Sequence, residues 1–83
     1  MNFIAEISIM PLKSLPDPQG MLISSELQKL GFSDIRNIRI GKHITLEITA
    51  NSKEAAMERV KDSCNLLLHN PVTEGYEYTI KEV

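Results

Sequence analysis

Two cations flank a glycine in the run Arg39-Ile40-Gly41-Lys42, and this run is the part of the chain best suited to hold an anion. The planar guanidinium of an arginine offers paired donors to a phosphate or carboxylate, and a lysine adds a second positive charge. Lys42 lacks the upstream glycine and the strand–loop–helix setting of a phosphate-binding P-loop. We therefore favour a solvated or intersubunit role for Arg39 and Lys42 over a small-molecule anion site.

The other reactive side chains have ordinary structural interpretations. Cys64 is the only cysteine, and its place on an apolar helical stripe predicts a packed thiol rather than a reactive one. His69 is expected to bond the last carbonyls of the same helix, and His43 is expected at an exposed strand position. One cysteine and two histidines at these spacings do not make a zinc site. Glu74 and Glu77 have no visible partner that would prepare them for acid–base work.

The run Asp17-Pro18-Gln19-Gly20 predicts the start of a helix over Pro18–Leu30. The Asp17 carboxylate is a good N-cap, and Pro18 fits the first helical position because its missing N–H costs nothing there. Gly20 lies inside the first turn, where glycine costs up to about 1 kcal/mol relative to alanine. That cost indicates that another backbone approaches Gly20 closely, and a partner subunit is the candidate.

Apolar patterning divides the rest of the chain into further elements. Alternation of apolar and polar residues predicts four strands. These are Asn2–Met10, Asp34–Ile40, Lys42–Ala50 and Gly75–Val83. A second helix is expected over Lys53–Leu68. Only one residue, a glycine, separates the second strand from the third, which predicts a tight antiparallel hairpin.

The predicted order of strand, helix, strand, strand, helix, strand places the fold in the α+β class. Right-handed crossovers put both amphipathic helices on one face of a four-stranded antiparallel sheet, giving a two-layer βαββαβ sandwich of ferredoxin-like type. The first helix should bury Ile23, Leu27 and Leu30 against the sheet. The opposite sheet face should be polar and carry Glu6, Ser8, Asn37, Arg39, Thr45, Glu47, Thr49, Glu77, Thr79 and Lys81.

Size and composition narrow the class of protein. The 83 residues are 42% hydrophobic and 24% charged, which is typical of one soluble domain spanning residues 1–83. A compact chain of this length has a radius of gyration of about 12 Å. The net charge of −2 argues against nucleic-acid binding. No apolar run approaches the roughly 18 residues of a membrane span, so no membrane contact and a cytoplasmic location are expected.

Several short runs occur together in an order and spacing found in one known family. They are Asp17-Pro18-Gln19-Gly20, Leu30-Gly31-Phe32, Arg39-Ile40-Gly41-Lys42, Cys64, Leu67-Leu68, Asn70-Pro71-Val72, Glu74 and Tyr76. Over nearly the whole chain the sequence resembles PurS, the family of small subunits of phosphoribosylformylglycinamidine synthase in de novo purine biosynthesis.

The resemblance implies a subunit without catalytic residues in a multi-chain ligase. In that family a PurQ-like glutaminase releases ammonia from glutamine, and a PurL-like synthetase uses ATP and Mg²⁺ to convert a formyl amide into the amidine. The small subunit joins the two and forms homodimers, which sometimes pair into tetramers. No cofactor or metal site is therefore implied in this chain. The candidate subunit contacts are Asp17, Gln19, Gly20, Arg39, Lys42 and His43.

The predicted homodimer should form through the polar sheet face, the edge strands, or both, because proteins normally cover unpaired sheet edges. A small-ligand-sensing regulatory domain is the alternative function, since ferredoxin-like domains often bind amino acids between protomers and fold alone does not decide function. RNA binding on the sheet is less favoured, because the exposed face lacks the aromatic side chains on which bases stack.

Overall fold

A single antiparallel sheet organises the molecule, and the computed structural model describes it together with every other residue from Met1 to Val83. Its three strands lie in the order β2-β1-β3. They are β1 (Asn2–Pro11), β2 (Lys42–Thr49) and β3 (Glu74–Glu82). Strand β1 is central because its apolar side chains alternate without a break, and Ile7 pairs with Ile44 on one side and Tyr78 on the other. The α+β class is confirmed.

Helix α2 (Lys53–Ser63) covers one face of this sheet, and a π-helical turn, η1 (Cys64–Leu68), continues it. The helix begins where the Ser52 hydroxyl accepts a hydrogen bond of 3.1 Å from the backbone N–H of Ala55. Val60 and Cys64 then pack, fully buried, against the apolar side chains of β1. Together they form the core of the protein. Neither α2 nor the other helix has the length and apolar character that crossing a membrane requires.

The end of the α2–η1 segment confirms the structural interpretations of Cys64 and His69. Burial raises the pKa of the Cys64 thiol, so this side chain is protonated and enclosed rather than nucleophilic. The Nδ1 atom of His69 lies 2.6 Å from the carbonyl oxygen of Cys64, where it closes the last turn. Both residues therefore serve the packing of the helix.

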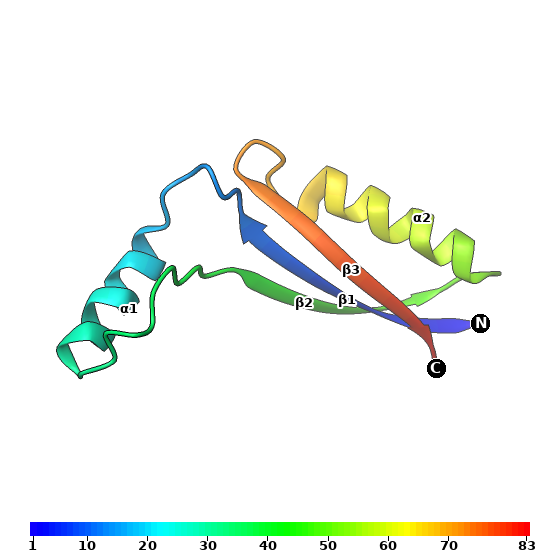
Figure 1. Cartoon of the computed structure of the whole chain (residues 1–83). Coiled ribbons are helices and arrows are strands. Elements are labelled where there is room, and N and C mark those ends of the chain that lie inside the picture. Colours follow the sequence, from blue (N-terminus) through cyan, green and yellow to red (C-terminus); the bar gives the residue numbers. More distant parts are fainter.

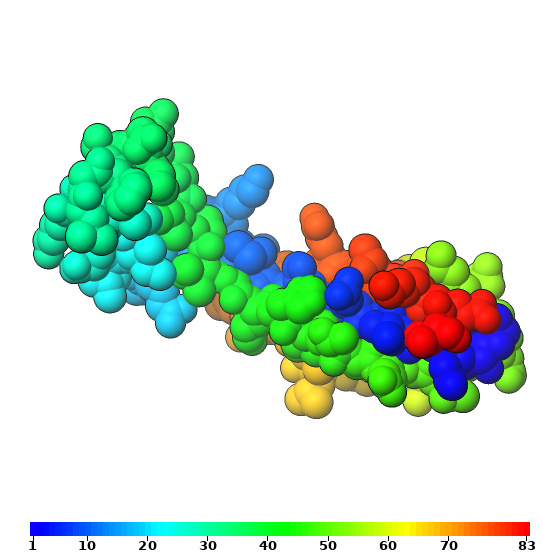
Figure 2. Space-filling view, turned by 90° about the horizontal axis from the view of Figure 1, so that it is seen from below, coloured from blue at the N-terminus to red at the C-terminus, as the bar shows by residue number.

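Helix α1 (Pro18–Lys29) stands apart from the sheet, beyond the end where β1 finishes and β2 begins (Figure 1). The predicted packing of this helix on the sheet is wrong, because α2 alone packs there and Leu22 and Leu30 are 62% and 73% exposed. We call residues 18–40 the arm. Figure 2 shows the arm as one end of an elongated body. The radius of gyration is 16.5 Å, well above the compact value of about 12 Å.

The predicted fourth strand over Asp34–Ile40 is absent, so the four-stranded sheet and its hairpin are wrong. Asn37 has a φ of 60°, in the left-handed region, which interrupts an extended strand. Gly41 alone is also a shorter connection than the roughly two residues that common hairpins use. The backbone N–H of Ile40 bonds the Asp17 carboxylate instead of a neighbouring strand. These residues thus belong to the arm.

The sheet face opposite α2 is polar, as the alternation predicts. Its exposed side chains are Glu6, Ser8, His43, Thr45, Glu47, Thr49, Glu77, Thr79 and Lys81. Asn37 and Arg39, which the sequence places on the same face, lie in the arm.

Candidate functional site at the base of the arm

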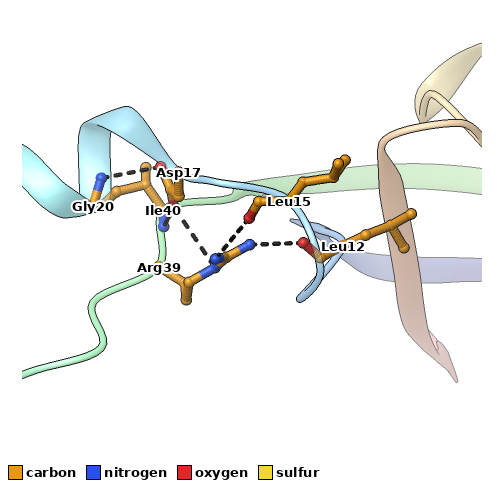
Figure 3. A network of polar contacts seen from close by, with 6 residues as sticks. All are labelled: Leu12, Leu15, Asp17, Gly20, Arg39 and Ile40. Atoms are coloured by element: carbon orange, nitrogen blue, oxygen red, sulfur yellow. Dashed lines mark hydrogen bonds and ion pairs between the residues drawn. The ribbon is translucent and has the colours of Figure 1, made fainter.

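The arm meets the sheet at a polar network drawn in Figure 3, which we call the joint. It lies where the chain enters the arm after β1 and leaves it before β2. Its members are Leu12, Leu15, Asp17, Gly20, Arg39 and Ile40. Three of the six candidate contact residues, Asp17, Gly20 and Arg39, therefore meet in one place.

Asp17 connects the two backbone segments that meet at the joint, one entering the arm and one leaving it. Its Oδ1 atom accepts a hydrogen bond of 3.0 Å from the backbone N–H of Gly20, which caps α1 as the sequence predicts. Its Oδ2 atom accepts one of 2.7 Å from the backbone N–H of Ile40, at the far end of the arm. Asp17 is 8% exposed, so a single buried carboxylate both starts the helix and holds the returning chain.

Arg39 completes the joint with its guanidinium group. Nη1 donates to the carbonyl oxygen of Leu15 at 3.0 Å, and Nη2 donates to that of Leu12 at 2.8 Å. Its Nε atom lies 3.9 Å from Asp17 Oδ2, where the opposite charges attract. The donors at the tip of the side chain are thus engaged within the chain, and the geometry gives Arg39 an internal positioning role rather than a free anion-binding one.

Gly20 is required by the close approach of the returning chain. A Cβ atom at this position would overlap the carbonyl oxygen of Ile38 and lie 2.9 Å from its carbonyl carbon. The close backbone approach inferred from the sequence is confirmed, but its source is this chain's own residue Ile38 and not a partner subunit. Gly41 is crowded in the same way by the Ile9 carbonyl and the Met10 sulfur.

Lys42 lies beside the joint and pairs with Glu74 across the end of the sheet. The Lys42 Nζ atom is 3.4 Å from Glu74 Oε2, while Glu74 Oε1 accepts a 2.8 Å hydrogen bond from the backbone N–H of Asn70. That N–H, and then the charge of Lys42, hold the pKa of Glu74 below its usual range. The sequence-based view of Glu74 as unpartnered is wrong. The signal that reveals the pair is strand register, because Lys42 and Glu74 face the end of β1 from opposite sides at Ile9 and Pro11.

The remaining candidates, Gln19 and His43, are exposed. Gln19 lines an open groove of about 300 Å³ at the joint. The residues around it are Pro11, Pro16, Asp17, Pro18, Gln19, Ile40, Gly41, Lys42 and Glu74. His43 is outside this groove, on the polar sheet face beside Glu6 and Glu77. The site therefore has a rigid interior, made by Asp17, Gly20 and Arg39, and an accessible rim.

The acid stability of the protein should depend on Asp17. The N–H of Gly20, then that of Ile40, with a contribution from Arg39, lower the pKa of Asp17 below its ordinary value of 3.8. A lowered pKa in the folded state means that ionised Asp17 stabilises the fold above the unfolded value, and that this stabilisation is lost as pH falls through the folded value. We expect the wild type to lose stability between about pH 5 and about pH 2, and Asp17→Asn to lose less over the same range.

Urea denaturation at several pH values measures this difference. Glu74 provides the matched comparison, because its pKa is lowered at a separate position. Glu74→Gln should reduce the pH dependence of the free energy of unfolding independently of Asp17→Asn. The variant that carries both substitutions should show the weakest pH dependence. If the free energy of unfolding of Asp17→Asn fell with decreasing pH as strongly as that of the wild type, the electrostatic role assigned to Asp17 would be contradicted.

Comparison with known sequences gives one consistent result. The chain matches the family model "PurS: Phosphoribosylformylglycinamidine (FGAM) synthase" over residues 4–82. It is 39% identical over 71 residues to the phosphoribosylformylglycinamidine synthase subunit PurS of Thermotoga maritima, covering 86% of this chain and 87% of that protein. The corresponding subunit of Bacillus subtilis is 34% identical over 71 residues, with 86% and 83% covered.

Solved structures agree with the sequence comparison. The crystal structure of the Thermotoga maritima PurS subunit matches with a TM-score of 0.90 at 36% identity and covers 98% of this chain and 93% of that one. A chain in the structure of PurLQS from the same organism matches with a TM-score of 0.91 at 36% identity, covering 98% and 99%. Because coverage is nearly complete, the match includes the arm as well as the sheet. The chain belongs to the PurS family, the small subunit of phosphoribosylformylglycinamidine (FGAM) synthase.

Proposed function

We propose that this chain is a non-catalytic connector that holds a PurQ-like glutaminase against a PurL-like synthetase, so that ammonia passes between them during FGAM synthesis. The observation that carries this proposal is the family match over residues 4–82. The likeness to a chain of the Thermotoga maritima PurLQS structure supports the same three-component assembly for this protein. The chain's contribution is shape and binding surface.

The chemistry of the candidate site fits a connector. Asp17 and Arg39 are engaged in holding the arm, and the thiol of Cys64 is buried with a raised pKa. These groups stabilise structure, and a reacting substrate would have to displace their present partners. We therefore assign ATP, Mg²⁺ and glutamine hydrolysis to the PurL-like and PurQ-like chains.

The accessible rim of the site is the proposed contact surface. Gln19, Lys42 and His43 are exposed, whereas Asp17, Gly20 and Arg39 act by fixing the position of the arm. We further propose that the functional form is a homodimer or a pair of homodimers. The polar sheet face, the edge strands, or both would form the contact between the copies.

Reconstitution of the three-chain enzyme tests the connector. The synthetase and glutaminase from the same organism are mixed with and without this chain, and amidine formation is measured with glutamine as the nitrogen source. Omitting the chain should lower the rate by at least about tenfold, because linked components gain on the order of 100-fold or more in effective association. Undiminished synthesis without the chain would remove the proposal.

Ammonium chloride in place of glutamine is the internal control. Synthesis from free ammonia needs no transfer between subunits, so it should depend much less on this chain. Calorimetry of the isolated chain with amino acids tests the small-ligand alternative. Amino-acid binding together with unchanged reconstitution would favour a sensor domain over a connector.

A further inference from the structure

We propose, resting on the connector role of the proposed function, that the solvent side of the α2–η1 segment is a docking surface for an unlike subunit. This surface, which we call the outer face, consists of Glu54, Glu58, Asp62, Leu66 and Leu67. It lies on the side of the segment that points away from the sheet (Figure 1). The partner that fits it carries an apolar socket edged by lysine or arginine side chains.

A wide turn at the end of the helix leaves two leucines outside the core. The π-helical turn η1 closes where the backbone N–H of His69 bonds the carbonyl oxygen of Cys64 at 3.2 Å. Of the three leucines in this turn, Leu68 packs against the core. Leu66 and Leu67 are 85% and 83% exposed. Short π-helical turns that end or interrupt an α-helix are frequent at functional sites.

The two leucines give the outer face an apolar end. They are the most exposed large hydrophobic side chains of the chain, and they are adjacent in the sequence. Val72, in the connection that follows, is 76% exposed as well. Exposed apolar side chains that gather beside polar ones are typical of protein contact sites, where they become anchors in the partner's pockets.

Three carboxylates continue the outer face along α2. Glu54, Glu58 and Asp62 follow one another at intervals of four residues, and Leu66 takes the next place in the same series. Like charges four residues apart destabilise a helix slightly, so this arrangement does not serve the helix itself. None of the ion pairs within the chain involves these carboxylates. They are therefore available to cations of another protein.

The charge of the outer face selects an unlike chain as its partner. A twofold contact between two copies places the same patch of both chains face to face. Carboxylates would then meet carboxylates, and such pairs of like charge oppose binding. A chain with cations around an apolar socket gains from both parts of the outer face. The proposed connector requires two unlike partners, so a chain of this kind belongs to the same assembly.

Binding kinetics with the synthetase and the glutaminase of the same organism test the apolar end. A chain carrying Leu66→Ser and Leu67→Ser should dissociate at least about tenfold faster from one of these subunits, because buried anchors carry most of the binding energy. Both leucines are exposed in the free chain, so its stability in urea should match that of the wild type. Val83→Ser is the matched control, since Val83 is 75% exposed outside the outer face.

The carboxylates should affect a different rate constant. Asp62→Lys should lower the association rate constant about threefold or more at low ionic strength, because charges at the edge of an interface steer the encounter. The difference from the wild type should shrink as added salt screens the charges. Glu82→Lys makes the same change in net charge at an exposed position on β3 and should leave association close to that of the wild type.

A photoreactive label identifies the chain that contacts the outer face. Lys61 is exposed beside Asp62, and Cys64 is buried, so Lys61→Cys gives a single site for a benzophenone maleimide. Illumination of the reconstituted three-chain enzyme should join this position to the synthetase or to the glutaminase. A cross-link between two copies of this chain, or none, would overturn the docking surface.

The outcomes separate the docking surface from the connector role. Suppose that omission of the chain lowers FGAM synthesis, while the leucine and Asp62 variants bind both subunits with wild-type rate constants. The outer face is then overturned and the connector remains. Undiminished synthesis without the chain would remove the connector, and this inference with it.

Discussion

An Ile7→Ala variant is expected to lose about 2–5 kcal/mol in free energy of unfolding. Ile7 lies in the middle of β1 with none of its surface exposed, between Ile44 and Tyr78. Truncation removes buried methyl groups and leaves a cavity that the neighbouring strands cannot close. A chain of this length has only about 4–12 kcal/mol of stability in total. The variant should therefore be largely unfolded at moderate urea concentrations.

Urea denaturation followed by circular dichroism measures the loss. Leu66→Ala is the matched control, because Leu66 in η1 is 85% exposed and its truncation should change stability by less than about 0.5 kcal/mol. Seven hydrophobic residues make up the buried core, so few contacts remain to compensate for a defect at Ile7. If Ile7→Ala and Leu66→Ala lowered the free energy of unfolding equally, this placement of the core would be contradicted.

Gly20→Ala should lower the free energy of unfolding by about 1–3 kcal/mol. The usual effect of this change inside a helix is a gain of up to about 1 kcal/mol, since alanine favours the helix. Here the added methyl group would overlap the Ile38 carbonyl, so the returning chain must move. That movement strains the hydrogen bonds that the backbone N–H groups of Gly20 and Ile40 donate to the Asp17 carboxylate. A loss of stability in Gly20→Ala therefore indicates that Gly20 is crowded by Ile38, whereas a gain would indicate an ordinary first turn of a helix.

Gly75→Ala is the control for Gly20→Ala. The nearest atom to a Cβ at Gly75 is Leu12 Cδ2 at 3.9 Å, which is ordinary van der Waals contact. Its stability in urea should stay close to that of the wild type. A Gly20→Ala chain as stable as the wild type, or more so, would show that Ile38 does not press on the helix.

The sequence predicted the local elements well because their signals are local. Alternation in β1, β2 and β3 depends on residues two apart, and the cap of α1 depends on Asp17 and its next three neighbours. The position of α1 was predicted wrongly because an apolar stripe shows that a helix has an apolar face, and not what that face packs against. The absent fourth strand has a visible cause in Asn37, a residue type that tolerates a positive φ.

The candidate site could be predicted only in part. Asp17, Gly20 and Arg39 were each recognised, but their meeting depends on a chain reversal more than twenty residues long. The acceptors of Arg39 are the carbonyls of Leu12 and Leu15, and every residue carries such a group, so no pattern marks them. The Lys42–Glu74 pair likewise depends on which strands flank β1.

The double attachment of Asp17 has a mechanical consequence. One carboxylate bonds the backbone at both Gly20 and Ile40, so any displacement of residues 18–40 would disturb the start of α1 and the returning segment together. A force that a neighbouring chain applies at the tip of α1 therefore reaches Ile40 and, two residues on, Lys42 at the mouth of the groove. A displacement at the tip of the arm is thus transmitted to the joint, where the arm meets the sheet.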